Sequence, residues 1–150
     1  GHGRPPGERL GPVETKPLAE VLRRLGEVRF EESFDLVVAV LEGGREPARL
    51  VAERLGLPLA GLHVNFRDER HRPRHDAPVL VAPLDVDVRG KRVLVVDDRS
   101  RTGGTLAFAK EVLKDAALVK TLAVNGKADY SLFDEACFVF PWAAAGSAAG

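Results

Sequence analysis

Hydrophobic positions change their spacing several times along the chain, and each change predicts an element. After Pro17, leucine and valine recur every three or four residues, which predicts a helix with Thr15 as its cap and Gly26 as its stop. Residues 35–41 are instead continuously apolar from Leu36 onward, which is typical of a strand buried on both faces of a parallel sheet. Helical spacing returns over residues 48–55. The pattern therefore predicts a helix, a strand and a second helix in this order.

The alternation of strands and helices continues through the second half of the chain. Apolar runs predict further strands at residues 57–64, 79–82, 93–96, 117–124 and 138–140. A third helix is predicted to begin at the Thr-Gly-Gly-Thr turn of residues 102–105. Strands that alternate with helices are typical of an α/β fold, here an open, mainly parallel sheet flanked by helices.

Composition adds bounds to this fold. A chain of 150 residues fits one domain, which we expect over residues 13–142 between flexible tails at 1–12 and 143–150. The 22 Lys and Arg balance the 22 Asp and Glu, so no overall field attracts nucleic acid or an anionic membrane. The apolar runs are too short to cross a bilayer, and the single cysteine, Cys137, suits a reducing compartment. We expect a cytoplasmic protein without nucleic-acid or membrane partners.

The segment after the 93–96 strand carries the most chemistry. Asp97 and Asp98 end this strand, at the sheet edge where open α/β folds bind ligands. The N–H groups and hydroxyls of the 102–105 turn can hold a phosphate. Two carboxylates repel a phosphate, but they suit sugar hydroxyls or a hydrated Mg²⁺. The segment therefore predicts a sugar phosphate as ligand.

These residues resemble the signature with which type I phosphoribosyltransferases bind phosphoribosyl pyrophosphate (PRPP): an apolar strand, two acids and a Thr-Gly-x-Thr turn. Residues 36–47 are similar to the family's pyrophosphate loop. Lys127 and the Phe-Pro-Trp of residues 140–142 are similar to the hood of purine enzymes related to xanthine-guanine and hypoxanthine phosphoribosyltransferases. The resemblance implies a type I phosphoribosyltransferase-like fold with a small hood. By analogy with the family, it also implies an enzyme that forms a homodimer. It also implies Mg²⁺-dependent transfer of the phosphoribosyl group from PRPP to a nucleobase, a purine, with release of pyrophosphate.

The resemblance further implies a role for each matching residue. The catalytic positions fall on Asp97, Asp98 and Arg101, and the two acids would also hold the ribose hydroxyls and, through water, Mg²⁺. The 5′-phosphate would be held by Arg101, Thr102, Gly103, Gly104 and Thr105, the pyrophosphate by Glu42, Gly43, Gly44 and Arg45, and the base by Lys127, Phe138 and Val139. The charged segment 66–76 would close over PRPP and exclude water.

Three positions depart from the family pattern. Glu42 brings a negative charge to the pyrophosphate loop, Arg101 replaces an acid that helps to take the proton of a 6-oxopurine, and Cys137 stands in place of a stacking aromatic residue. Since Glu42 and Arg101 carry opposite charges, we expect them to form an ion pair across the site. The departures keep a second hypothesis open, a PRPP- or nucleotide-binding regulatory protein with little catalysis.

Overall fold

The computed structural model describes residues 14–65, 79–80 and 86–146. The predicted tail at 1–12 and the predicted closing segment at 66–76 lie outside these residues. No helix in the described part of the chain is long and apolar enough to span a membrane. The elements are α1 (Leu18–Glu27), β1 (Leu36–Leu41), α2 (Arg45–Leu55), β2 (Leu59–Asn65), β3 (Val79–Leu80), β4 (Arg92–Ser100), α3 (Gly104–Val112), β5 (Leu118–Gly126), β6 (Tyr130–Phe133) and α4 (Pro141–Gly146).

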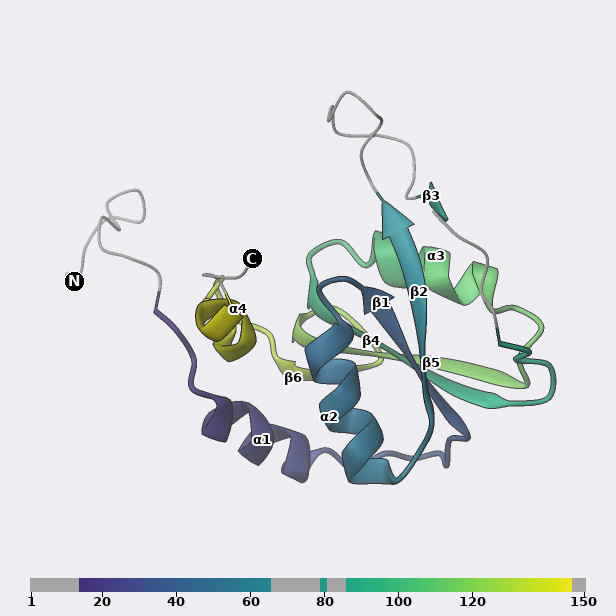
Figure 1. Ribbon diagram of the computed structural model, residues 1–150, viewed down its shortest axis with the longest axis horizontal. Helices are drawn as coiled ribbons and strands as arrows, with labels where there is room; N and C mark the ends of the chain where they lie inside the picture. Colours follow the sequence, from purple (N-terminus) through teal and green to yellow (C-terminus); the bar gives the residue numbers. More distant parts are fainter. Residues whose placement is uncertain (1–13, 66–78, 81–85, 147–150) are drawn as a thin grey trace.

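The strands of the described residues form one sheet in the order β3-β2-β1-β4-β5-β6. Strands β2, β1, β4, β5 and β6 run parallel, and β3 pairs antiparallel with the edge of β2. Helices α1 and α2 pack on one face and α3 on the other (Figure 1). The prediction of an open, mainly parallel sheet flanked by helices is therefore confirmed.

The core is built around β4, the strand between β1 and β5. Residues 93–96 are all fully buried. Because side chains alternate along a strand, Leu94 and Val96 join the core beneath α1 and α2, whereas Val93 and Val95 join the core beneath α3. Burial on both faces explains why these positions are continuously apolar.

Strand β4 is longer than its apolar run predicts. It continues through the two acids to Ser100, and its register with β5 pairs Asp97 with Ala123 and Ser100 with Gly126. Hydrophobicity marks only the part of a strand that is covered on both sides, so it misses the polar end that extends beyond the apolar core. As a result, Asp97 is a strand residue and the turn begins only after Ser100.

The N-terminal segment differs from the prediction. Thr15 does not cap α1, which follows Pro17 without a side-chain cap and extends past Gly26 to Glu27. Instead, Thr15 forms a parallel bridge with Val139, flanked by hydrogen bonds from the Lys16 N–H to the Val139 oxygen and from the Val139 N–H to the Glu14 oxygen, both 2.9 Å. An extended segment that satisfies its backbone in this way cannot also turn back to cap a helix.

The C-terminal part differs as well. The strand predicted at 138–140 is limited to the Val139 bridge, and the last strand is β6, whose four residues are too few for a clear periodic signal. Helix α4 covers residues 141–146 and so overlaps the segment predicted as a tail. Pro141 suits a first helical turn, and the Trp142 ring stacks on Phe140 with ring centroids 5.1 Å apart.

The junction between β4 and β5 generates a stability prediction. Gly126 ends β5 with φ +128°, and a Cβ there would lie 1.9 Å from the Ser100 oxygen. Gly90 also has a positive φ, +76°, but a Cβ there would meet nothing within 4 Å. We expect Gly126→Ala to lower the free energy of unfolding by about 3 kcal/mol or more, because strain and overlap add. Gly90→Ala should cost about 1 kcal/mol in urea unfolding. Equal losses would contradict the overlap.

Candidate active site

Asp97 and Asp98 are adjacent in β4 but lie in different environments. Asp97 is 7% exposed, and its Oδ1 accepts a hydrogen bond from the Asp98 N–H at 2.8 Å. Burial, followed by the negative charge of Asp98, raises the pKa of Asp97 to about 8. Asp98 is only partly buried. The charged form of Asp97 is therefore disfavoured, even though the charge of Arg99 acts in the opposite direction. A bound cation or a hydroxyl donor would stabilise this carboxylate.

Two glycines bring the loop after β1 against this pair. A Cβ at Gly43 would lie 2.6 Å from an Asp98 carboxylate oxygen, and one at Gly44 would lie 2.5 Å from the Val96 oxygen. The Gly44 N–H donates to the Val40 oxygen at 2.7 Å. Any side chain at either position would push the loop away from β4. These glycines are thus required for the close packing of the loop and the acidic pair.

The expected ion pair between Glu42 and Arg101 is wrong. Glu42 Oε1 contacts the Arg45 guanidinium at 2.7 Å, and Glu42 Oε2 lies 4.0 Å from His63 Nδ1. Arg45 follows Glu42 by three residues and lies on the first turn of α2. A pair between such close neighbours costs less conformational entropy than a pair between two separate segments across the site. The Arg45 hydrogen bond lowers the pKa of Glu42, which is exposed to solvent. Arg101 makes no ion pair with a carboxylate in the described residues.

A pocket of about 330 Å³ lies over the turn that leads into α3. Residues 99–105 line it. Gly103 has a left-handed φ of +88°, and the Thr102 hydroxyl accepts a hydrogen bond from the Gly104 N–H at 3.2 Å. The other N–H groups of the first helical turn have no partner within the helix, so the turn can bind an anion.

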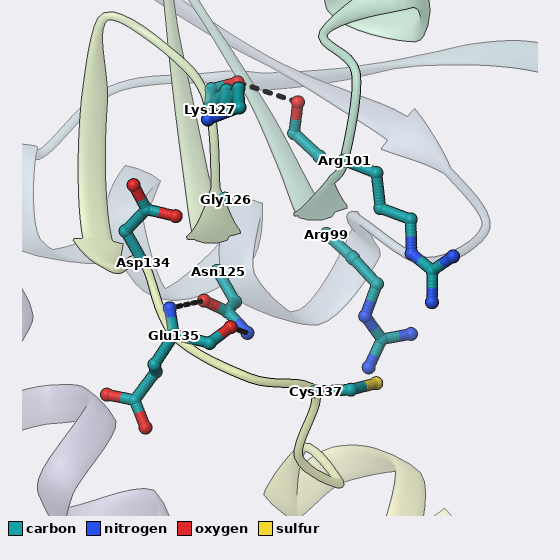
Figure 2. Close-up of a pocket in the computed structure, with 9 residues that line it drawn as sticks. Arg99, Arg101, Asn125, Gly126, Lys127, Asp134, Glu135 and Cys137 are labelled. Atoms are coloured by element: carbon teal, nitrogen blue, oxygen red, sulfur yellow. Dashed lines mark hydrogen bonds between the residues drawn. The ribbon is translucent and has the colours of Figure 1, made fainter. Parts of the chain in front are cut away.

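Figure 2 shows the residues that line a second pocket, of about 200 Å³. Both pockets share residues 99–101. The second is lined by Arg99, Ser100, Arg101, Asn125, Gly126, Lys127, Asp134, Glu135 and Cys137. It therefore joins the ends of β4 and β5 to the segment after β6.

Of the three residues predicted to contact a base, Lys127 lines this second pocket. The Phe138 ring instead is buried in the core, edge-on to Phe133 and Phe140 with ring centroids 5.4 and 5.3 Å away. The backbone of Val139 is paired with the segment before α1. Cys137, which is exposed, faces the pocket where Phe138 was expected. The physical reason is that the large apolar ring of Phe138 gains more from the core than from a polar pocket.

The structure also adds pocket residues that the sequence interpretation missed. Asn125 exchanges hydrogen bonds with the backbone of Glu135, at 3.0 and 3.2 Å, and so fixes the segment after β6. The Ser100 hydroxyl donates to the Lys127 oxygen at 2.6 Å. Arg99 is the most distinctive addition, because it lies midway between Asp97 and Arg101 in an extended segment. Extending the predicted strand by four residues would have revealed it.

The two carboxyl groups of the acidic pair suit Mg²⁺ as ligands, but they do not form a complete metal site by themselves. In the described ranges, no three acid, histidine or cysteine side chains gather to enclose a metal ion. Mg²⁺ commonly keeps several waters and uses one or two carboxylates together with substrate phosphates. Asp97 and Asp98 supply hard oxygen ligands of this kind, and the unfavourable burial of Asp97 would be offset by a cation.

Burial of Asp97 predicts a pH-dependent stability. The unfolded carboxyl ionises near 3.8 and the folded one near 8, so the folded state binds the extra proton and loses stability as the pH rises between these values. We expect Asp97→Asn to raise the melting temperature of the ligand-free protein at pH 8 by about 2–4 °C and to have little effect below about pH 4. Thermal unfolding measured by circular dichroism checks this, with the exposed Asp115→Asn as control. A lower melting temperature at pH 8 would contradict the assignment.

Comparison with solved structures agrees with this architecture. The chain is similar to a crystal structure of a purine phosphoribosyltransferase from Pyrococcus horikoshii, with 30% identity, a TM-score of 0.71, and coverage of 85% of this chain and 92% of that one. The resemblance to purine phosphoribosyltransferases predicted from the sequence is therefore confirmed.

Curated relatives match over shorter stretches. A ribose-phosphate pyrophosphokinase from Thermococcus kodakarensis is 44% identical over 93 residues, which are 61% of this chain and 31% of that protein. A bifunctional protein PyrR from Limosilactobacillus reuteri is 39% identical over 66 residues, which are 42% of this chain and 37% of that protein. The chain thus spans about a third of the length of these relatives. The phosphoribosyl transferase domain model matches residues 14–145, and the chain belongs to this family.

Proposed function

We propose that the protein transfers the 5-phosphoribosyl group of PRPP to a nucleobase, with release of pyrophosphate. The observation that carries this proposal is that the acidic pair lies near the end of β4 and the anion-binding turn directly follows this strand, with the pocket of about 330 Å³ over the turn. A diol needs hydrogen-bond acceptors and a phosphomonoester needs N–H donors. A ribose 5-phosphate presents both at once.

The proposed binding mode follows from these contacts. The turn at residues 102–105 would hold the 5′-phosphate, and Asp97 and Asp98 would accept hydrogen bonds from the ribose hydroxyls. The loop of residues 42–45 would face the pyrophosphate, where the Arg45 guanidinium offsets the charge of Glu42. Mg²⁺, held through water by the acidic pair, would supply positive charge for the departing pyrophosphate.

Catalysis in this mode consists mainly of positioning and charge stabilisation. The bond between ribose C1 and the pyrophosphate oxygen breaks, and a nitrogen of the base bonds to C1. Asp97 and Asp98 would fix the ribose ring, and the side chains of the second pocket would hold the base beside C1. A purine is the proposed acceptor, with Lys127 donating to its exocyclic oxygen. The homodimer and the cytoplasmic location stay predictions.

The regulatory alternative has its own support. Glu42 is exposed in the loop that would face pyrophosphate, and Arg101 cannot accept a proton from a base. Both features weaken catalysis more than they weaken binding of the ribose phosphate. A protein of this kind would bind PRPP or a nucleotide and turn it over slowly.

An assay with several nucleobases distinguishes phosphoribosyl transfer from the regulatory alternative. The protein is incubated with PRPP, Mg²⁺ and each of adenine, guanine, hypoxanthine, xanthine, uracil and orotate, and released pyrophosphate is measured. We expect release with at least one base, because the proposed site holds both substrates beside each other. Tight binding of PRPP with no release for any base would support the regulatory alternative.

Removing the acidic pair tests the ribose site. We expect Asp97→Asn combined with Asp98→Asn to weaken PRPP binding by about 100-fold or more, since both carboxyl groups proposed to bind the sugar and hydrated Mg²⁺ are lost. Calorimetric titration with PRPP and Mg²⁺ measures the affinity. Asp87→Asn with Asp115→Asn removes the same charge at exposed positions and should leave the affinity unchanged. Unchanged affinity in the Asp97 and Asp98 variant would place the ribose elsewhere.

A further inference from the structure

Two guanidinium groups dominate one side of the second pocket. Arg99 and Arg101 point to the same side at the end of β4, whereas Asp134 and Glu135 lie on the other side of Asn125 (Figure 2). Glu135 is engaged with Lys16, whose Nζ lies 3.1 Å from its carboxylate. The arginine side of the pocket therefore carries concentrated positive charge.

Arg99 is held in place by the segment after β6. One terminal nitrogen donates to the Phe138 oxygen at 3.0 Å, and the guanidinium carbon lies 4.8 Å from the centre of the Phe140 ring. The Arg99 Nε is shielded from solvent and has no hydrogen-bond partner. A guanidinium carries five N–H donors, so the observed hydrogen bond leaves most of them for other partners. Fixed orientation with unused donors is the condition for binding an anion with little loss of side-chain entropy.

Arg101 supplies a second cation beside the first. Its side chain is exposed, and no carboxylate of the described residues forms an ion pair with it. Lys127 lines the same pocket at the end opposite Cys137 (Figure 2). The lining thus combines three cations with two acids, one of which is already paired. A neutral ligand would leave the charges of Arg99 and Arg101 without compensation.

We propose that the second pocket binds a nucleobase that carries a negative charge, with Arg99 and Arg101 on its anionic edge. This inference rests on the proposed function and narrows its substrate class. The volume of about 200 Å³ suits a single heterocycle. The charge comes either from an ionised ring or from a carboxylate substituent, and both present planar acceptors that match a guanidinium.

The chemistry of such a base suits this pocket. A guanidinium stays protonated, so Arg101 cannot take the ring proton and instead stabilises the base after the proton has gone to water. The ring nitrogen then donates its electron pair to ribose C1. The bond from C1 to the pyrophosphate oxygen breaks, and its electron pair leaves with the pyrophosphate. Arginine therefore selects a base that already carries the charge.

Matched pairs of bases test the proposal. The ring of xanthine loses a proton more readily than that of hypoxanthine, so xanthine is the anionic member of the first pair. In the second pair, orotate has a carboxylate that uracil lacks. Calorimetric titration at pH 8 measures the affinity of the protein for each base and, separately, for PRPP with Mg²⁺. We expect the anionic member of at least one pair to bind about 10-fold or more tightly, and the pair that shows the preference identifies the source of the charge.

Arginine variants assign the preference to the pocket. Arg101→Gln and Arg99→Gln should each reduce it about 10-fold while leaving the affinity for the neutral base within about twofold. Arg99→Lys, which keeps the charge and the packing stem, serves if Arg99→Gln fails to fold. Arg23→Gln on the exposed face of α1 is the matched control and should change neither affinity.

The outcomes separate this inference from the proposed function. Failure of the unmodified protein to bind PRPP would overturn the function, whatever the bases do. Binding of PRPP without a preference for either anionic base, or without detectable binding of either, would overturn only the inference. If the arginine variants weaken PRPP binding and leave the base preference unchanged, the two arginines serve the 5′-phosphate and the inference is also wrong.

Discussion

The placement of a carboxyl group inside the central strand of the sheet is the constraint on which the rest of the site depends. Asp97 lies where the apolar core ends, beside a second acid, and the polypeptide provides a backbone N–H as its closest partner. Burial of this kind is unfavourable unless another group compensates for it. The burial of the four apolar residues of β4 between β1 and β5 offsets the unfavourable free energy of burying Asp97.

Parallel pairing brings the segments that follow β1 and β5 next to the end of β4. The carboxyl ends of β1, β4 and β5 meet at the same edge, so segments far apart in sequence share one surface. The loop after β1 approaches closely enough that Asp98 occupies the space of a side chain at Gly43. At the end of β5, Gly126 gives the same closeness to Ser100. Small residues at the crossing points thus allow charged groups from three strands to act together.

The sequence predicted the parts of the molecule that repeat a regular pattern. The buried strands, the first three helices, the acids and the Thr-Gly-Gly-Thr turn all follow from local spacing. Local spacing could not predict the partner of Glu42, because Arg45 and Arg101 both carry the right charge and only their distances in space decide between them. The role of Phe138 depends on which side of the chain faces the core, a choice that a shift of one residue reverses. Arg99 was missed because a strand's polar end has no hydrophobic signal.

The segment before α1 has a consequence for the outer wall of the second pocket. Thr15 pairs with Val139, and the Lys16 ammonium lies 4.3 Å from the centre of the Phe133 ring while it contacts Glu135. Two stretches more than a hundred residues apart thereby form a single clasp. The same ammonium also lies 4.6 Å from the centre of the Phe138 ring, and both rings are buried. The wall of the pocket that Glu135 forms is thus tied to the hydrophobic core through one lysine side chain, so a substitution in either aromatic residue would alter the pocket from inside the domain.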